Sequence, residues 1–521
     1  MSRIQVETVL GTKVSPRPTG LSLQDKLENP CNEGKQMMTI NVSAPSARII
    51  SWKLIHWESV NYLVRRLQLR IAEAIKLGRY GRAKALQWLL THSFYAKLLA
   101  IKRVTQNKGR NTPGIDRIIW RTSRQKMQAV KRLKRRGYRS LPLRRIYIPK
   151  KNGTLRPLGI PTMIDRGQQA LHLLALEPIA ETKGDKNSYG FRPKRSIHDA
   201  IEQCFKVLAR KHSSKWILEG DIKSCFDKIS HKWLLENTII DKNLLKQWLK
   251  AGYMEKNIFH CTESGSPQGG IISPTLANIT LDGLETILRD KAKPKDKINY
   301  LRYADDWICT ANSREILEEK VLPKVINFLK ERGLELSMEK TRISHIDDGF
   351  EFLGFNLRKY KGKLLIKPAK KGIKTFLSNI RKTIKSKQAA TAEQLIHTLN
   401  PKIQGWANHY RSCVAKRTFN HVDSSIFSAI WKWIKRKHHN KNVSWIRNKY
   451  FTRIGLRNWC FFSQKDKNTS VLTLASNTSI KRHVKIKADA TPFDPEYQEY
   501  FLKRERKLRY RTLITGSSNR L

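Results

Sequence analysis

Acidic residues are scarce in this sequence. The chain of 521 residues contains 43 Asp and Glu against 102 Lys and Arg, which leaves a formal net charge of +59. The basic residues are spread over the whole length and are not confined to one tail. This distribution predicts a long nucleic acid that contacts several domains. The alternative is a basic surface that is simply solvated.

Cysteine pairs and long apolar runs are also missing. The seven cysteines are scattered and never form a C-x-x-C pair, so neither a disulfide framework nor a cysteine-rich zinc site is predicted. No stretch approaches the roughly 20 apolar residues that a membrane span needs, and no secretory signal is recognised. We therefore expect an intracellular protein without membrane contact. Glu7, Asp25 and Glu28 are unlike an acid-poor organelle transit peptide, so bacterial cytoplasm, near the nucleoid, is preferred over an organelle.

The apolar pattern divides the chain into five parts. We expect a poorly ordered extension over residues 1–50, a helical extension over 51–110, a mixed α+β domain over 111–365, a basic helical domain over 366–444 and a final region over 445–521. Helices are expected from Val60 to Ile75 and over the whole run "AKALQWLLTHSFYAKLLAIKRV". Strands are expected in "RRIYIPK", "WILEGDI", "INYLRYADDWICT" and "FEFLGFNL".

Two adjacent aspartates interrupt an apolar and aromatic run in "YLRYADDWICT". Asp305 and Asp306 repel each other, and carboxylates in such a frame need a compensating cation. A third carboxylate, Asp221, ends the strand in "WILEGDI". If that strand pairs with both arms of a hairpin that turns at Ala304, Asp305 and Asp306, then Asp221 and Asp305 can share two divalent ions, with Asp306 more peripheral. Oxygen ligands favour Mg²⁺. An isolated Asp-Asp pair is more often a solvated turn.

Seven sequence blocks follow one another along the chain. In order they are "IYIPKKNGTLRPLGIPT", "NSYGFRPKRSIHDAI", "WILEGDIKSCFDKISH", "GSPQGGIISPTLANITLDGLE", "YLRYADDWI", "GLELSMEKTRI" and "FEFLGFNL". This order, with a Y-x-D-D box, resembles the reverse transcriptases. With the preceding helical segment and "NPKIQGWANHYR" after it, the chain resembles a group II intron-encoded reverse transcriptase and maturase from about residue 52 to 500. The resemblance implies a right-hand polymerase fold with fingers and palm, an N-terminal helical extension, a helical thumb or maturase domain and a small basic C-terminal region.

The resemblance also implies roles for five residues at the nucleotide. Lys150 and Arg156 flank the turn "KNGT" and would bind the triphosphate, while Phe226 would exclude a ribose 2′-hydroxyl. Gln268 would lie near nucleotide and primer, with Gly269 and Gly270 allowing backbone to approach the substrate. Lys340 would protonate the leaving pyrophosphate. The alternatives are solvated charges for the basic residues, core packing for Phe226 and a plain turn around Gln268.

The helical region after residue 370 would bind RNA through its basic surface. The predicted RNA-binding residues are Arg411, Lys416, Arg417, Lys432 and Arg436. Trp406, Trp431 and Trp433 are equally well explained as core. The segment "KRHVKIKADATPFDPEYQEYFLKRERKLRYR" resembles the DNA-binding region that precedes an HNH nuclease in relatives, and without a C-x-x-C pair or a His/Cys cluster we expect no nuclease domain.

We therefore predict an RNA-directed DNA polymerase and maturase that binds group II intron RNA, assists its splicing and copies it into cDNA during retrohoming. Its partners would be the intron RNA, target DNA and dNTPs, with Mg²⁺ as cofactor and no membrane; the sequence leaves the oligomeric state open. Two alternatives stay open: an RNA-binding splicing factor whose polymerase has decayed, and a stand-alone defence or retron-like reverse transcriptase. Decay would be expected to damage the acidic triad or the basic residues at the triphosphate, which are all present.

The carboxylates should serve polymerisation and not RNA binding. Asp305→Ala should abolish Mg²⁺-dependent cDNA synthesis, because the metal pair loses an anionic ligand, while RNA affinity and splicing assistance stay nearly intact. Primer extension and RNA binding by the same protein preparation measure both properties. Synthesis of cDNA at the normal rate by the variant would contradict the assignment.

Overall fold

The computed structural model describes residues 51–149, 153–465 and 468–517. The predicted extension over residues 1–50 and the predicted triphosphate ligand Lys150 lie outside the described residues.

The first helices pack against a long buried helix, α5 (Met163–Lys183). They are α1 (Trp57–Lys76), α2 (Tyr80–His92) and α3 (Phe94–Gln106), and α4 (Ser123–Arg132) packs against α3. Helix α1 is confirmed, with Val60, Val64 and Ile71 buried on its inner face. The second expected helix is wrong as a single run, because the extended backbone at Ser93 ends α2 and begins α3. Serine is favoured at helix boundaries, and the break lets both helices contact α5.

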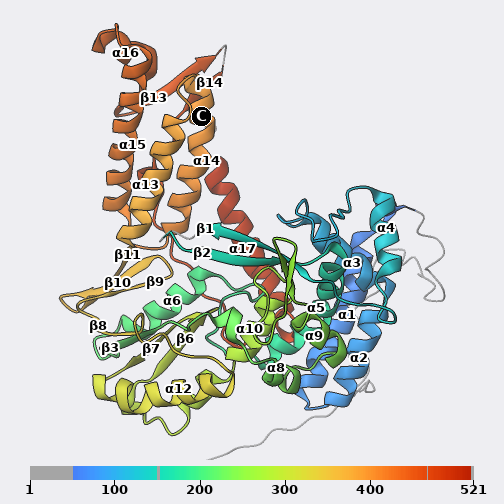
Figure 1. Ribbon diagram of the computed structural model, residues 1–521. Coiled ribbons are helices and arrows are strands. Elements are labelled where there is room, and N and C mark those ends of the chain that lie inside the picture. The colour runs from blue at the N-terminus through green and yellow to red at the C-terminus, as the bar shows by residue number, and fades with distance from the viewer. Residues whose placement is uncertain (1–50, 150–152, 466–467, 518–521) are drawn as a thin grey trace, which may run out of the picture. The chain divides into compact units, whose positions relative to one another are not determined.

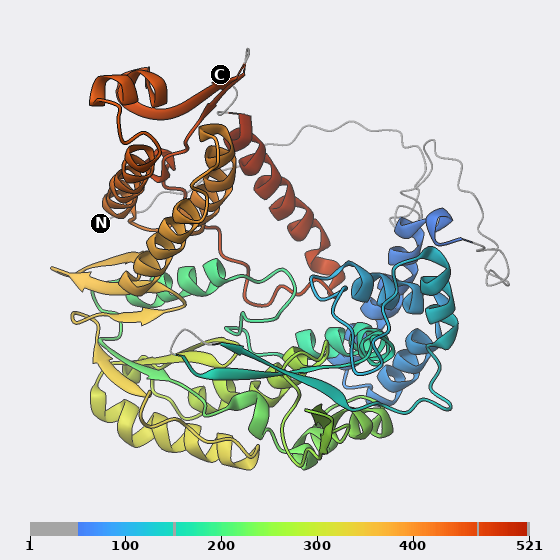
Figure 2. The same ribbon diagram turned by 45° about the horizontal axis from the view of Figure 1, so that its top comes forward.

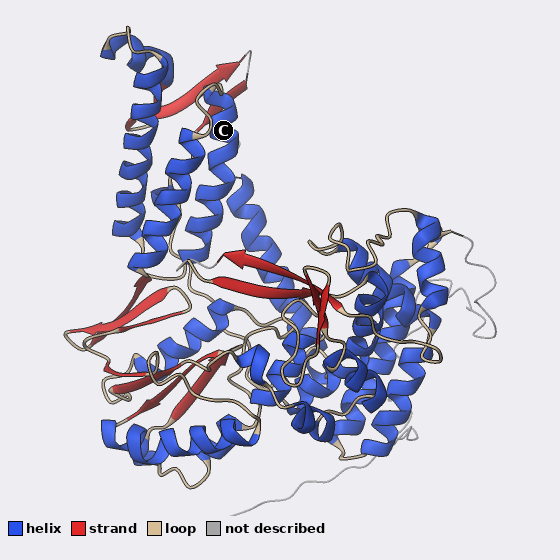
Figure 3. Cartoon of the chain, in the orientation of Figure 1, coloured by secondary structure: helices blue, strands red, loops and turns tan. Residues whose placement is uncertain are grey.

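The strands in the described part of the chain form four small sheets, and Figure 3 shows the strands in red. Their orders are β2-β1-β4-β5, β6-β7-β3-β8, β11-β10-β9 and β12-β13-β14. The first contains β1 (Leu143–Pro149), β2 (Leu155–Ile160), β4 (Tyr253–Glu255) and β5 (Ile258–His260), and the second contains β3 (Trp216–Gly220), β6 (Asn299–Tyr303), β7 (Asp306–Ala311) and β8 (Arg342–His345). The third contains β9 (Phe350–Phe352), β10 (Phe355–Tyr360) and β11 (Lys363–Pro368). The strands expected in the four quoted segments are thereby confirmed.

The β6-β7-β3-β8 sheet is buried on both faces (Figure 1). Ile217, Leu301 and Ile308 belong to one core, which includes side chains of α6 (Ile197–Leu208). Leu218 and Trp307 point to the other core, because side chains alternate along a strand. Helices of that second core are α7 (Cys225–Lys228), α8 (His231–Asn237), α9 (Lys242–Leu249), α10 (Ser273–Leu281), α11 (Leu284–Arg289) and α12 (Leu322–Glu331). Burial on both sides explains the continuous apolar runs in these strands.

A helical domain follows the third sheet. Helices α13 (Lys370–Lys385), α14 (Ala392–Tyr410) and α15 (Lys416–Lys437) lie beside one another in both ribbon views (Figures 1 and 2). Their apolar faces continue the core of the β6-β7-β3-β8 sheet, with Ile380, Leu399 and Ile430 all buried. After them come α16 (Val443–Tyr450), β12 (Phe451–Ile454), β13 (Arg457–Lys465), β14 (Asn468–Val471) and α17 (Gln498–Ser517).

A buried polar network joins three of the quoted blocks, and we call its members Asn187, Asn278, Asp282, Glu285 and Arg302 the polar brace. Arg302 is fully buried, forms an ion pair with Asp282 and donates to Asn278 Oδ1 at 3.0 Å. Asn278 donates to the carbonyl of Gly190 at 2.9 Å. Asn187 donates to Glu285 through its backbone at 2.9 Å and its side chain at 2.7 Å. The brace therefore fixes "NSYGF" and "YLRYADD" against α10 and α11.

Residues 478–507, which we call the C-terminal strap, return to the earlier part of the chain. Asp199 at the start of α6 accepts hydrogen bonds from His483 at 2.9 Å, the Ile486 amide at 2.7 Å and Arg504 at 2.8 Å. Burial alone raises the pKa of Asp199, but the His483 hydrogen bond and the Arg504 charge hold it below its ordinary value. Asp494 pairs with Lys76 of α1. The strap thus occupies part of the predicted DNA-binding region, whose DNA binding stays a prediction.

The brace should contribute strongly to stability. Asp282→Ala leaves the buried guanidinium of Arg302 without its carboxylate, and such a loss costs about 3–5 kcal/mol of the free energy of unfolding. Urea unfolding followed by tryptophan fluorescence measures this cost. The control is Glu318→Ala, which removes the exposed pair between Arg314 and Glu318 and should cost no more than about 0.5 kcal/mol. An equal loss in the free energy of unfolding for the two variants would contradict the claim that the polar brace contributes strongly to stability.

Candidate active site and nucleic-acid interface

The turn between β6 and β7 is the centre of the candidate site. Ala304 and Asp305 form a two-residue loop, and Tyr303 pairs with Asp306 across it. Ala304 has a φ of +58°, as the first position of such hairpin loops requires. Arg302 donates to the Ala304 carbonyl at 3.3 Å, so the polar brace holds the strained turn from below.

Two glycines let neighbouring segments approach this hairpin. A Cβ atom on Gly190 would lie 2.3 Å from the backbone nitrogen of Ala304. A Cβ atom on Gly220 would lie 2.0 Å from the indole of Trp307. No side chain fits at these separations, so glycine is required at both positions if the aspartate turn is to be packed this closely.

The structure brings the three predicted aspartates to one end of the sheet. Strand β3 pairs with β7 and β8, so the expected pairing with both hairpin arms is wrong: β7 lies between β3 and β6. The reason is that β8 takes the other edge of β3. Gly220 pairs with Trp307, which puts Asp221 and Asp306 at the same end of adjacent strands, with Asp305 in the turn beside them.

These carboxylates influence one another electrostatically. Removal from water, then repulsion by Asp305 and Asp221, raises the pKa of Asp306 from 3.8 to about 6. Burial, with further repulsion from Asp305, raises the pKa of the neighbouring Cys225 thiol to about 12. The turn and the end of β3 therefore concentrate negative charge.

Lys340 reaches the same carboxylates. The Ser337 amide donates to the Asp221 carbonyl at 2.8 Å, and Lys223 donates likewise to Glu335 at 2.9 Å, so the two segments run side by side. This pairing brings Lys340 Nζ to 2.8 Å from Asp221 Oδ2. The hydrogen bond and the charge of Asp221 raise the pKa of Lys340. The sequence alone left this lysine equally well explained as a surface residue.

The donor set fits a hard divalent cation in its chemistry. All three side chains offer carboxylate oxygens, and the Lys340 ammonium already compensates the charge of Asp221. Within the described ranges, no group of three or more His, Cys, Asp or Glu side chains stands close enough to hold a metal ion. The carboxylates are thus gathered but not arranged as a closed ligand shell.

Two of the predicted nucleotide residues share a cavity. Phe226 and Gln268 both line a space of about 280 Å³ next to the β2-β1-β4-β5 sheet. The Phe226 ring is half-buried and meets the Phe191 ring edge to face, with centroids 6.5 Å apart. Arg156 is exposed on β2, opposite Ile148. These positions leave Phe226 accessible from the cavity and Arg156 accessible from solvent.

The glycines after Gln268 lie close to neighbouring protein atoms. A Cβ atom on Gly269, whose φ is +122°, would lie 2.5 Å from the carbonyl oxygen of Gly159, and one on Gly270 would lie 2.5 Å from Ser273 Oγ. The Gly159 amide also donates to the Gln268 carbonyl at 2.8 Å. Gly269 thus packs against β2 and Gly270 against the start of α10, which fixes the backbone at Gln268, and the approach of this backbone to substrate stays a prediction.

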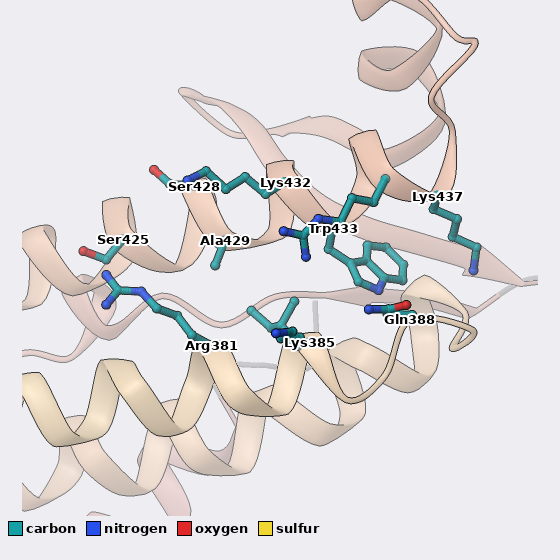
Figure 4. Close-up of a pocket in the computed structure, with 11 residues that line it drawn as sticks. Arg381, Lys385, Gln388, Ser425, Ser428, Ala429, Lys432, Trp433 and Lys437 are labelled. Carbon is teal, nitrogen blue, oxygen red and sulfur yellow. The ribbon is translucent and has the colours of Figure 1, made fainter.

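A basic groove lies between α13 and α15, and we call it the thumb groove (Figure 4). It has a volume of about 460 Å³ and is lined by Arg381, Lys385, Lys432, Arg436 and Lys437, with no carboxylate among its described lining residues. The side chains on its α15 side include the short ones of Ser425, Ser428 and Ala429, which leave space in the groove. Lys437 donates to the Ala390 carbonyl at 2.6 Å, whereas the other four cations form no ion pair with a described residue. Such a surface suits a phosphate backbone.

The five predicted RNA-binding residues fall into two groups. Lys432 and Arg436 line the thumb groove, while Arg417 lies about 22 Å away along α15. Lys416 donates to the carbonyl of Ser476, and Arg411 accepts from the Lys481 amide through its carbonyl at 2.9 Å. Arg411 and Lys416 therefore contact the chain near the C-terminal strap. Trp433 is buried and donates to the Lys387 carbonyl at 2.9 Å, whereas Trp406 and Trp431 are half-buried.

Sequence reasoning missed the residues that position the site. Arg302, Asn278 and Asp282 were absent from the predicted site. A signal existed for Arg302, since a charged residue within an apolar strand needs a buried partner. The partner itself could not be identified, because Asp282 is 20 positions away in sequence. Arg381 and Lys385 lie within the basic helical domain that the sequence predicts, but only helix packing shows that they face Lys432.

Three family models match the chain. "Reverse transcriptase (RNA-dependent DNA polymerase)" matches residues 148–357, "N-terminal domain of reverse transcriptase" matches 52–133, and "Group II intron, maturase-specific domain" matches 373–451. The first match contains all three aspartates, and the third contains the whole thumb groove.

Curated relatives agree with these matches. Protein YkfC of Escherichia coli is 35% identical over 339 residues, which cover 57% of this chain and 88% of the relative. The group II intron-encoded protein LtrA of Lactococcus lactis is 31% identical over 425 residues, covering 62% and 69% respectively. A solved telomerase structure from Candida tropicalis has a TM-score of 0.37 at 12% identity, over 60% of this chain and 68% of that one.

Among the described helices, none is long and apolar enough to span a membrane.

The free energy of unfolding should depend on pH because of the charge repulsion at Asp306. A folded-state pKa of about 6 against an ordinary 3.8 means that the ionised carboxylate destabilises the fold above pH 6 and that protonation relieves this between pH 6 and 4. In the presence of a chelator, Asp306→Asn should therefore gain most over the parent at pH 7.5, and the gain should shrink as the pH falls through 6. Urea unfolding at several pH values measures it. A gain that is constant from pH 7.5 to 5 would contradict the raised pKa.

Proposed function

We propose that this chain, a member of the group II intron-encoded reverse transcriptases with a maturase domain, binds an intron RNA. We further propose that it assists the splicing of this RNA and copies it into cDNA. Reverse transcriptase and maturase function follow from the family. We propose in addition which substrates the protein uses, which residues bind them, and that both functions serve retrohoming.

Polymerisation is assigned to the aspartates at the β6-β7 turn. Asp221, Asp305 and Asp306 would hold divalent cations, and we propose Mg²⁺ because every donor is a carboxylate oxygen. When bound, such cations activate a 3′-hydroxyl and neutralise the charge of the leaving pyrophosphate. Lys340, whose ammonium donates to Asp221 Oδ2 at 2.8 Å, would supply a proton to the leaving pyrophosphate.

Nucleotide selection is assigned to the fingers and the adjoining cavity. Arg156, with Lys150, would bind the triphosphate of a dNTP. Phe226 would lie under the sugar and leave no room for a 2′-hydroxyl, and Gln268, fixed through Gly159, would contact nucleotide or primer. The shared cavity of Phe226 and Gln268 supports this assignment.

Intron RNA is assigned to the thumb groove. The observation that carries the proposal is that four cations without described ion-pair partners face one another across the groove, inside the segment that matches the maturase model. Lys432 and Arg436 would bind phosphates from the α15 wall, and Arg381 and Lys385 from the α13 wall. Arg417, Lys416 and Arg411 would extend the surface toward the C-terminal strap.

Two alternative functions remain distinguishable. A splicing-only maturase would not need the aspartate turn, yet the polar brace, two glycines and Lys340 all support that turn. A stand-alone defence or retron-like reverse transcriptase would not need the thumb groove. We propose that the protein works in the bacterial cytoplasm at the nucleoid, where its target DNA lies; its bacterial relatives support this location.

The thumb groove should weaken RNA binding when its charge is reduced. Lys432→Ala should lower affinity for structured RNA and flatten the log–log salt dependence by roughly 0.7 to 0.9, because one phosphate contact is lost. The matched control is Lys435→Ala, which removes the same charge from the same helix but faces the Trp431 ring, outside the groove. Binding of a group II intron transcript at several salt concentrations measures both.

Splicing assistance and primer extension complete the test. Lys432→Ala should reduce splicing assistance more than extension on a saturating primer–template. Identical slopes for Lys432→Ala and Lys435→Ala would contradict the groove assignment. Extension without any effect of the protein on splicing would instead favour the stand-alone polymerase.

A further inference from the structure

A further cavity lies among the N-terminal helices and α5. It has a volume of about 600 Å³, within the range of about 300–1,000 Å³ that is typical of small-ligand sites. Its walls come from α2, α3, α5 and the segments before α9 and after α4. Buried Leu133, Leu171 and Ala175 form an apolar floor. None of the nucleotide or RNA-binding residues discussed above lines it.

An exposed aromatic pair stands at this cavity. Trp88 is 56% exposed, and the His92 ring stacks on it with centroids 4.2 Å apart and an interplanar angle of 23°. His92 Nδ1 also lies 2.8 Å from the Trp88 carbonyl oxygen, which fixes the imidazole one turn along the helix. The indole is therefore held as a flat, solvent-facing platform. Such platforms bind nucleobases, because every base has a π-face.

Unpaired cations surround the platform. Lys84, Lys97, Lys134 and Arg136 line the cavity and form no ion pair with any residue that the structure describes, while Arg135 pairs with Asp241 at 2.5 Å. Burial and then the charge of Lys134 lower the pKa of Lys97, so two ammonium groups lie close together without a carboxylate between them. Phosphate groups would relieve this repulsion.

Fixed polar groups complete the cavity. Gln87 Nε2 donates to the Ile239 carbonyl at 2.9 Å, which orients its amide, and its Oε1 accepts no hydrogen bond from a described residue. Gln168 Nε2 donates to the Lys134 carbonyl at 2.8 Å, which fixes the backbone beside the cations. An oriented amide oxygen can accept from a ring N–H or an exocyclic amine of a base.

We infer that this cavity binds one unpaired nucleotide of an RNA strand, with the base stacked on Trp88 and the flanking phosphates bound by Lys97, Lys134 and Arg136. The inference rests on the proposed RNA binding, but it adds a second recognition point on the N-terminal helices. A free nucleotide offers the same chemistry. An RNA strand is favoured because the four unpaired cations exceed what one monophosphate needs.

Photo-crosslinking tests the contact at residue level. The probe is a 12-nucleotide RNA with an unpaired 5-iodouridine, and crosslinked peptides are identified by mass spectrometry. The expected crosslink lies at Trp88, and Trp88→Ala should weaken binding of this RNA by about 5- to 150-fold, the range found for loss of a stacked base. Trp88→Phe should restore most of the affinity, because a ring remains. The control is Leu89→Ala, an exposed neighbour outside the cavity.

The other outcomes are also decisive. Crosslinks found only elsewhere, with unchanged affinity for Trp88→Ala, would overturn the inference. Equal crosslinking by 5-iodouridine monophosphate, with full competition against the RNA, would assign the cavity to free nucleotides and overturn the RNA strand. Failure of the parent protein to bind an intron transcript at all would refute the proposed function itself. The thumb groove is tested separately by Lys432→Ala, which leaves the cavity at Trp88 unchanged. Loss of binding in Lys432→Ala with no effect of Trp88→Ala would therefore overturn only the inference about the cavity. Circular dichroism verifies that each variant is folded.

Discussion

The buried guanidinium of Arg302 is the constraint on which the candidate active site depends. It cannot be solvated, so it must keep Asp282, Asn278 and the Ala304 carbonyl as partners. Those partners lie on α10, on the residue that follows it and in the turn itself. One buried charge therefore sets the position of the turn that carries Asp305, and the repulsive aspartates are held together by interactions behind them.

The same logic extends outward from the turn. Asn278 holds Gly190, whose missing side chain allows close contact with Ala304, and Gly220 gives the same freedom under Trp307. Further away, Asp199 ties the C-terminal strap to α6, and Asp494 ties it to α1. Segments far apart in sequence thus support one charged site, while the thumb groove and the Trp88 cavity stay on separate elements.

The sequence predicted the elements better than their contacts. Apolar spacing identified α1 and the strands around Asp221 and Asp305, because burial imposes a period that is visible locally. The break at Ser93 was missed because both halves have helical periodicity. The pairing of β3 with one hairpin arm, the contact of Lys340 with Asp221 and the division of the RNA-binding residues depend on tertiary packing, which leaves no local pattern.

The most direct measurement is the affinity for Mn²⁺, a paramagnetic substitute for Mg²⁺, of the parent and of Asn278→Ala by electron paramagnetic resonance. Asn278 supports the turn through Gly190 and Arg302 but supplies no carboxylate. Loss of supporting hydrogen bonds around a metal site typically weakens binding by about 10- to 100-fold. We predict a loss of at least about tenfold in a variant that circular dichroism shows to be folded. Unchanged Mn²⁺ affinity would contradict the claim that the polar brace positions the carboxylates.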